Sequence, residues 1–269
     1  MCLMVVLSRT DPDHPLVVGA NRDERLDRPA VSATVLADHH PRILGGRDLL
    51  AGGTWLAVNE HGLVTGLTNR PSPSGRDPSK RSRGELPLAL AAHRNAASAV
   101  DEFVTRFDPA DYNSAWLLVG DRESLWYLEL GEEAAPVAEA LGPGVHILAN
   151  GPLHGSSPKT DYVRARVEGI AERDPPNALD HLATVLGDHS VPPAVEAALA
   201  SAERPKELAC ACVHTESFGT RSAALVQVPA EGTPRMWVAD GAPCSAPFAS
   251  IEHLWDTGQS TGTPVRAVP

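Results

Sequence analysis

The residue in the most distinctive chemical position is Cys2, which directly follows the initiator methionine. Removal of Met1, which a small second residue permits, would leave one residue with both a thiol and a free α-amine. The reference pKa of an α-amine is about 7.7–8.0 and that of a thiol about 8.5, so the amine can serve as the thiol's own general base. Such a thiolate attacks a carbonyl, forms a thioester and is released by water. The alternative is that Cys2 is a small apolar residue filling a strand.

Charged residues that can support this nucleophile follow the second apolar segment, as Asn21-Arg22-Asp23-Glu24. If this segment pairs with the first one, Arg22 would favour the thiolate and Asp23 would hold the α-ammonium or orient the amine. The alternative is a solvated loop, residues 22–29, that caps a hairpin.

Amide and guanidinium donors occur at three other strand boundaries. Asn69 follows the apolar segment Leu63–Leu67, and Asn150 follows a segment that begins at Val145. A strand-end amide can donate to a developing oxyanion, although asparagine is also a common turn residue. Arg221 precedes an apolar strand and can clamp an anionic group or support the nucleophile, or it can pair at the surface.

The elements that must position these residues alternate between strands and helices. Apolar patterns and turn signals predict strands first, then helices, strands, helices and strands again. Strands are predicted over 2–7, 16–20, 54–58, 63–67, 114–119, 124–130, 145–149, 208–213, 223–228 and 236–239. Helices are predicted over 84–94, 96–107, 157–172, 179–186 and 194–202, and residues 70–83 form a basic loop.

Because hairpin-joined strands dominate, the sheets should be mainly antiparallel. Helices that arrive in two batches can cover the outer faces of two stacked sheets, which gives an α+β fold: a four-layer αββα sandwich. No internal repeat or clean linker divides the chain, so residues 1–269 are expected to form a single domain.

The composition of the chain excludes several classes of binding partner. The chain has 269 residues, 42% hydrophobic, and a formal net charge of −11, which disfavours nucleic acid and anionic membranes as broad-surface partners. No apolar run approaches the roughly 20 residues that span a bilayer. The four cysteines are too scattered for a disulfide framework, and no second ligand pair suits a structural zinc site. We therefore expect a cytoplasmic protein, no metal ligands, and a small-molecule partner.

An ordered set of short motifs resembles the NRDE family, also called the transport and Golgi organisation protein 2 family. The set runs from residue 1 to about residue 228: Met1-Cys2, Asn21-Arg22-Asp23-Glu24, Gly53-Thr54-Trp55-Leu56-Ala57, Asn59-Glu60-His61-Gly62, Thr68-Asn69, Leu148-Ala149-Asn150-Gly151-Pro152 and Gly219-Thr220-Arg221-Ser222. That family is similar to N-terminal-nucleophile hydrolases, especially the cysteine branch of penicillin V acylases and bile-salt hydrolases.

The resemblance implies the αββα sandwich and assigns roles at the matching positions. Cys2 would be the nucleophile, Asp23 the acid near the amine and Arg22 a nearby cation. Asn150 and Asn69 would be oxyanion donors, and Arg221 a distal supporting arginine. The implied function is a cysteine amidohydrolase for a small amide or acyl substrate, which requires no cofactor.

Two alternatives to an enzyme stay open. Family members are associated with haem trafficking and with lipid and acyl-CoA homeostasis, so the fold can serve as a non-enzymatic carrier of haem or of an acyl lipid. A carrier needs an apolar slot, and the basic loop at 70–83 can meet haem propionates or a CoA phosphate. The remaining alternative is a scaffold that has kept the fold and lost activity.

Overall fold

The computed structural model describes residues 2–132, 134–168, 177–198 and 205–256. Every strand pair in it is antiparallel, and the strands form two sheets. The six-stranded sheet has the order β10 (Gly144–Leu148), β1 (Leu3–Ser8), β2 (Leu16–Arg25), β11 (Phe218–Val228), β12 (Arg235–Ala239) and β13 (Ala249–Ser250). The seven-stranded sheet runs in sequence order: β3 (Ala30–Ala37), β4 (Ile43–Asp48), β5 (Leu56–Asn59), β6 (Val64–Asn69), β7 (Ala115–Gly120), β8 (Leu125–Leu130) and β9 (Val137–Leu141).

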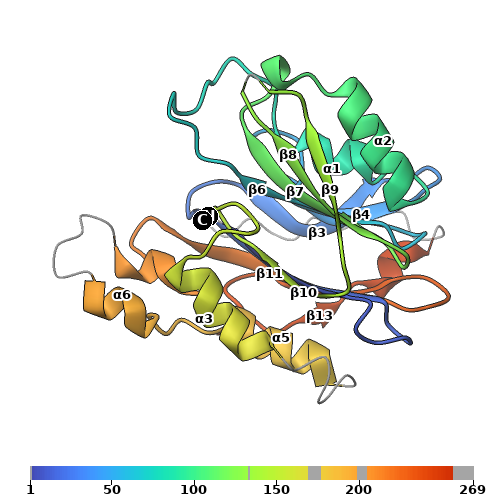
Figure 1. The fold of residues 1–269 in the computed structure, drawn as a ribbon. Coiled ribbons are helices and arrows are strands. Elements are labelled where there is room, and N and C mark those ends of the chain that lie inside the picture. Colours follow the sequence, from blue (N-terminus) through green and yellow to red (C-terminus); the bar gives the residue numbers. More distant parts are fainter. Residues whose placement is uncertain (1, 133, 169–176, 199–204, 257–269) are drawn as a thin grey trace.

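Helices cover the outer face of each sheet (Figure 1). The seven-stranded sheet is covered by α1 (Glu85–Leu90) and α2 (Ala96–Arg106), and the six-stranded sheet by α3 (Pro158–Val167), α5 (Ala178–Leu186) and α6 (Pro193–Ala198). Short 3-10 turns lie at Pro109–Asp111, Lys206–Ala209 and Glu252–Trp255. The predicted αββα sandwich of mainly antiparallel sheets is confirmed.

Three apolar layers hold the four structural layers together. β1 is buried along its whole length because both of its faces are covered. Its even-numbered residues, such as Met4 and Val6, pack between the two sheets, whereas Leu3, Val5 and Leu7 pack beneath α3 and α5. A third cluster joins α1 and α2 to the other sheet. This two-residue alternation determines which way each functional side chain points.

Several sequence predictions need correction. Residues 22–25 are strand rather than loop, because they continue β2 and pair with β11 from Phe218 to Ser222. The strand predicted over 208–213 is absent, since both edges of β11 are already taken by β2 and β12. Backbone groups of 208–213 bond elsewhere: the Asn21 amide donates to the Ala211 carbonyl and Cys212 N–H donates to the Asp188 carbonyl.

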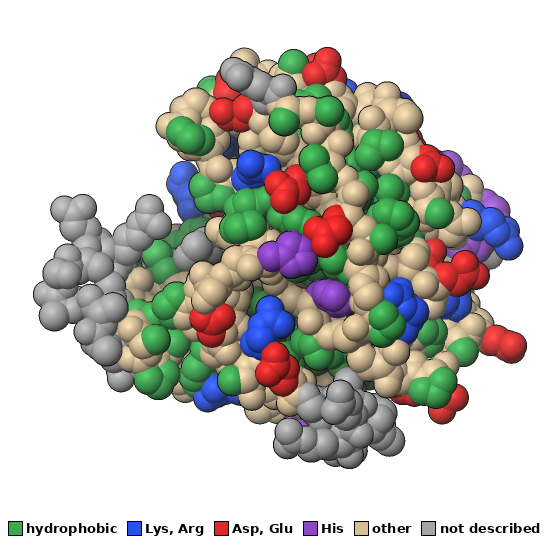
Figure 2. Space-filling model, in the orientation of Figure 1, with side chains coloured by type: hydrophobic (Ala, Val, Ile, Leu, Met, Phe, Trp, Pro, Cys, Tyr) green, Lys and Arg blue, Asp and Glu red, His purple; other side chains and the backbone are tan. Residues whose placement is uncertain are grey.

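Other differences concern element boundaries. Strands β3, β4, β9 and β13 were not predicted, and the helix expected over 84–94 extends only over Glu85–Leu90. Residues 169–172 and 199–202 of two predicted helices lie outside the described residues. The described helices include none long and apolar enough to cross a bilayer. Figure 2 shows acidic and basic side chains interspersed over the visible face rather than gathered into one basic surface.

Candidate functional site

Because side chains alternate along a strand, Arg22 and Asp23 of β2 point in opposite directions. Leu16, Val18 and Ala20 face the space between the sheets, and Val17 faces the helices. By the same alternation, Arg22 points between the sheets and Asp23 points toward α3. Both side chains are buried. Arg22 therefore lies in the layer between the two sheets, and Asp23 lies in the layer between the six-stranded sheet and its helices.

Cys2 lies where two cavities meet. It immediately precedes β1, whose Leu3 is opposite Asn21 of β2, so the next position along the register is beside Arg22. The thiol residue is partly exposed and lines a polar cavity of about 570 Å³ together with Arg22, Asp23 and Asn69. It also lines a second cavity of about 290 Å³ together with Asn150. The structure therefore brings five of the six predicted site residues around two adjoining spaces.

The carboxylate of Asp23 is held by two groups from distant segments. Its Oδ1 accepts a hydrogen bond from Thr220 Oγ1 at 2.6 Å, and its Oδ2 lies 3.3 Å from Lys159 Nζ. The side chains of Asp23 and Lys159 are 0% and 8% exposed, so this ion pair is desolvated. A buried pair of this kind fixes the carboxylate in one orientation beside Cys2.

Arg22 connects the two sheets at the mouth of the polar cavity. Its Nη2 donates to Asp48 Oδ2 at 3.1 Å, and its guanidinium carbon lies 4.5 Å from the centroid of the Trp55 ring. Arg28 donates to both oxygens of Asp48. Burial alone would raise the pKa of Asp48, but hydrogen bonds from Arg28 and from the backbone of Ala51 hold it below its ordinary value.

The thiol of Cys2 is not activated by its surroundings alone. Burial raises the pKa of Cys2, and the negative charge of Asp23 raises it further. The positive charge at the N-terminus, the backbone N–H of Asp23 and the guanidinium of Arg22 lower it, but the net pKa stays above that of an ordinary thiol. Nucleophilic chemistry here therefore needs a base that removes the thiol proton.

The two asparagines are connected by a hydrogen bond. Asn150 Nδ2 donates to the backbone carbonyl of Asn69 at 2.8 Å. Within the described part of the chain, the buried Oδ1 of Asn150 has no hydrogen-bond partner. Nδ2 carries two hydrogens, and the bond to Asn69 uses one of them. Asn150 thus lines the smaller cavity with an amide held in place by the end of β6.

Arg221 lies apart from this group. The pairing of β2 with β11 shifts register between Thr220 and Ser222, so Arg221 sits in a bulge. Its guanidinium donates to backbone carbonyls of the β2–β3 turn, including that of Arg25 at 3.1 Å and that of Leu26. It lines neither cavity beside Cys2 and supports the turn that leads to Arg28.

The basic loop at 70–83 forms one wall of the polar cavity. Gly53 and Gly84 pack backbone against backbone, since a Cβ on Gly53 would lie 2.5 Å from the Gly84 carbonyl carbon, and this contact brings the loop over the site. Seven basic and four acidic side chains line the cavity. A chain of net charge −11 therefore carries a basic pocket at Cys2, which favours anionic ligands.

Three contributors were not predicted from the sequence. Arg83 belongs to the basic loop, and its half-buried guanidinium donates to the Ser114 carbonyl while its charge reaches Cys2. Lys159 follows a helix N-cap, and Thr220 stands one residue before Arg221. The charge of the loop was a signal for Arg83, but nothing in local spacing pointed to Lys159 or Thr220.

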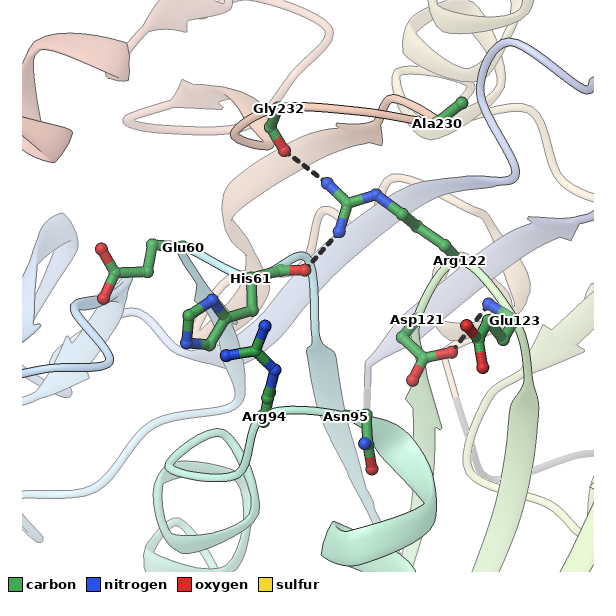
Figure 3. Close-up of a pocket in the computed structure, with 9 residues that line it drawn as sticks. All are labelled: Glu60, His61, Arg94, Asn95, Asp121, Arg122, Glu123, Ala230 and Gly232. Atoms are coloured by element: carbon green, nitrogen blue, oxygen red, sulfur yellow. Dashed lines mark hydrogen bonds between the residues drawn. The ribbon is translucent and has the colours of Figure 1, made fainter.

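Another cavity, of about 410 Å³, opens among the turns that join β5 to β6, β7 to β8 and β11 to β12 (Figure 3). Its Arg122 donates to the backbone carbonyls of His61, Gly232 and Pro229. Asp121 accepts from the backbone N–H of Ala96 at the start of α2, at 2.7 Å. The polar groups of Arg122 and Asp121 hold loops together. None of the described residues that line this cavity also lines a cavity at Cys2.

The four-layer sandwich with strand-end polar groups around Cys2 has the fold of the N-terminal-nucleophile hydrolases. It is similar to the C2A mutant of conjugated bile acid hydrolase from Clostridium perfringens, with a TM-score of 0.52 and 11% identity over 94% of this chain and 97% of that one. It is also similar to the Caenorhabditis elegans ortholog of N-acylethanolamine-hydrolyzing acid amidase, with a TM-score of 0.55 and 11% identity over 84% and 92% of the two chains.

The chain belongs to the Transport and Golgi organisation 2 family, whose model matches residues 1–238. The Transport and Golgi organization 2 homolog of Mus musculus is 28% identical over 233 residues, or 81% of this chain and 83% of the relative. The homolog of Bos taurus is 29% identical over 235 residues, with the same coverage. The resemblance found in the sequence is confirmed.

Proposed function

We propose that this protein is a cysteine amidohydrolase whose nucleophile is Cys2, exposed as the first residue by removal of Met1. The observation that carries the proposal is the position of Cys2, which lines both the polar cavity and the smaller one. The conjugated bile acid hydrolase of similar fold has a cysteine at its own second position, the residue replaced in the C2A mutant.

The proposed reaction has two halves. The α-amine of Cys2 takes the thiol proton, the sulfur bonds to the substrate carbonyl carbon, and the oxyanion accepts a hydrogen bond from Asn150 Nδ2. The carbon–nitrogen bond then breaks, and the α-ammonium returns the proton to the leaving amine. Water, deprotonated by the same α-amine, attacks the thioester, and the carbon–sulfur bond breaks to release the acid and restore the thiol. Asp23 orients the α-amine and stabilises the α-ammonium each time it forms.

The two cavities favour a substrate with an apolar group at one end and an anionic group at the other. The smaller cavity is lined largely by apolar residues: Ala149, Pro158, Val195, Pro205, Leu208 and Ala209. It suits an acyl group, and the basic cavity suits an anionic group on the other side of the scissile bond. The two hydrolases of similar fold are named for conjugated bile acids and for N-acylethanolamines, so N-acyl amides are the substrates to test first.

A direct test measures hydrolysis of N-lauroylglycine, which joins an apolar acyl group to a carboxylate, against N-lauroylethanolamine, which lacks the charge. Wild-type protein should release lauric acid from both, and faster from the glycine conjugate. Cys2→Ala should release none above background.

Cys210→Ala is the matched control, because it removes another thiol that is buried outside both cavities. Its rate should equal that of wild type. Equal rates for Cys2→Ala and wild type would refute the proposal.

A second candidate function, carriage of haem, is favoured by the same pairing of an apolar and a basic cavity. Of the described residues that line them, Cys2 is the only one with a side chain of the kinds that ligate haem iron. Ferric haem titrated into the protein should then give a saturable Soret shift that Cys2→Ala alters. Absence of a saturable shift at micromolar protein would reject this function.

A further inference from the structure

Four potential metal ligands converge on the helical side of the six-stranded sheet, outside the cavities described above. We call them the Cys/His cluster: His189, Cys212, His214 and Cys244. They come from three segments: the one that follows α5, the one that precedes β11, and the turn that follows β12 (Figure 1). Because 55 positions separate the first from the last, their spacing along the chain gives no sign of a common site.

The distances within the cluster suit one small ion. His214 Nε2 lies 3.4 Å from Cys212 Sγ and 3.2 Å from Cys244 Sγ. Ligand atoms of His189, His214 and Cys244 all lie within 4.8 Å of one another. Bond lengths of about 2.3 Å to sulfur and about 2.0 Å to nitrogen at a tetrahedral angle separate the two ligand atoms by about 3.5 Å. The observed nitrogen–sulfur contacts are close to that separation.

Backbone contacts fix the three segments against one another. Cys212 N–H donates to the Asp188 carbonyl at 2.9 Å, which ties the segment before β11 to the one after α5. Gly187 packs against the third segment, since a Cβ there would lie 3.5 Å from Cys244 Cα. Asp188 is anchored in turn by Arg166 of α3. The ligands are therefore presented by a framework that does not depend on an ion.

The solvent exposure of the four ligands also suits a metal site. Cys212 is fully buried, whereas His189, His214 and Cys244 are exposed, so an ion can enter from solvent and complete its coordination against the inner sulfur. Two thiolates and two imidazoles make a borderline-soft donor set, which favours Zn²⁺ over hard oxygen-seeking ions such as Mg²⁺ and Ca²⁺.

We propose that the Cys/His cluster is a tetrahedral transition-metal site with Zn²⁺ as its expected occupant. It pins the turn after β12 to the segment between α5 and β11. Val213, between the ligands Cys212 and His214, donates its N–H to Thr220 Oγ1, which itself donates to Asp23. The site is thus mechanically joined to the segment that holds Asp23, but it stands whether or not Cys2 is a nucleophile.

The test uses the full-length protein, stripped with a chelator and kept reduced, and Co²⁺ as a spectroscopic probe. One equivalent of Co²⁺ should produce the thiolate-to-cobalt band in the near ultraviolet and the intense visible bands of a tetrahedral ion, and Zn²⁺ should bleach both. Cys244→Ser should weaken Co²⁺ binding at least about tenfold and reduce the thiolate band, since an exposed ligand is lost without disturbing the core.

Cys210→Ser is the matched control, because this thiol lies on the same segment as Cys212 but outside the cluster, and its spectrum should equal that of wild type. His189→Ala, another exposed position, should weaken binding without removing the thiolate band. The proposal is overturned by a reduced protein that gives no thiolate band, or by an unchanged spectrum in Cys244→Ser. A Cys212–Cys244 disulfide that forms in air, together with no Co²⁺ binding after reduction, would equally overturn it.

Discussion

The two ends of the sandwich are built from the same strands but use charge differently. β6 begins after the turn at Gly62, at the far end of the sandwich, and finishes at Asn69 beside Cys2. β11 runs in the opposite direction, from Thr220 at the Cys2 end to the turn beyond Val228 at the far end. At the far end, the guanidinium of Arg122 is engaged by three backbone carbonyls. At the Cys2 end, basic side chains surround a cavity of about 570 Å³.

The comparison distinguishes charged side chains that stabilise the fold from charged side chains that remain able to bind a ligand. A guanidinium that joins three loops contributes to stability and has little capacity left for a ligand. The Cys2 end instead buries Asp23 with Lys159 and leaves the thiol facing solvent-accessible space, an arrangement that carries a desolvation cost and is typical of functional sites.

The largest expected effect is on Asp23. Asp23→Asn keeps the shape of the side chain but removes the charge that is to hold the α-ammonium, so kcat/KM for N-lauroylglycine should fall on the order of 10³-fold. Thermal unfolding measured in parallel shows whether the variant is folded, because Lys159 loses its buried partner. A folded variant that retains a tenth or more of the activity would contradict the role given to Asp23.

Asn150→Ala should have the next largest effect. Loss of one oxyanion donor costs about 10²–10³-fold in kcat, and KM should change little because the ground-state carbonyl binds weakly there. Steady-state kinetics separate the two parameters. An unchanged kcat would remove Asn150 from the mechanism and leave its hydrogen bond to Asn69 as a purely structural contact.

Arg122→Ala tests the other end. The loss of a guanidinium that bonds three carbonyls should lower the free energy of unfolding by about 2 kcal/mol, measured by urea denaturation. The kcat of the folded protein should equal that of wild type. A fall in kcat without loss of stability would show that the far end takes part in catalysis, and the contrast between the ends would fail.

The charge of Arg22 should favour the thiolate form of Cys2. Its positive charge lowers the pKa of the Cys2 thiol, so Arg22→Gln should move the pH midpoint of Cys2 alkylation to a higher pH than in wild type. The measurement is the rate of iodoacetamide modification of the N-terminal peptide as a function of pH. A midpoint that is unchanged or lower would show that the guanidinium serves only Asp48 and Trp55.

The smallest effect is expected at the basic loop. Arg76 and Lys80 line the polar cavity, and the described residues include no ion pair for either. Arg76→Gln should raise KM for N-lauroylglycine about threefold at low salt and leave KM for N-lauroylethanolamine unchanged. Equal effects on both substrates would show that the loop does not recognise the anion.

Much of the fold was predictable because its signals are local. Apolar alternation marked the central strands, and turn residues marked the hairpin between Leu56–Asn59 and Val64–Asn69. The end of β2 was missed because Arg22, Asp23 and Glu24 look like a loop, whereas pairing with β11 keeps them in the sheet. The dense charge there reflects a buried polar site that local propensity does not describe.

The candidate site was predictable in part for a different reason. Cys2, Asp23 and Asn150 stand at chain positions whose chemistry or motif is visible in the sequence. Lys159 and Thr220 were not found, because they reach Asp23 only through contacts across more than 130 residues of chain. The Cys/His cluster was missed for the same reason, since its ligands meet only when α5, β11 and the turn after β12 are packed together.

The proposed amidohydrolase acts through the sulfur of Cys2, as the first residue that remains after Met1 is removed. Protein quenched during turnover of N-lauroylglycine and digested for peptide mass mapping tests it most directly. We expect an N-terminal peptide that begins at Cys2 and carries one lauroyl group, lost on treatment with neutral hydroxylamine. A peptide that retains Met1, or a lauroyl group found only on another cysteine, would contradict it.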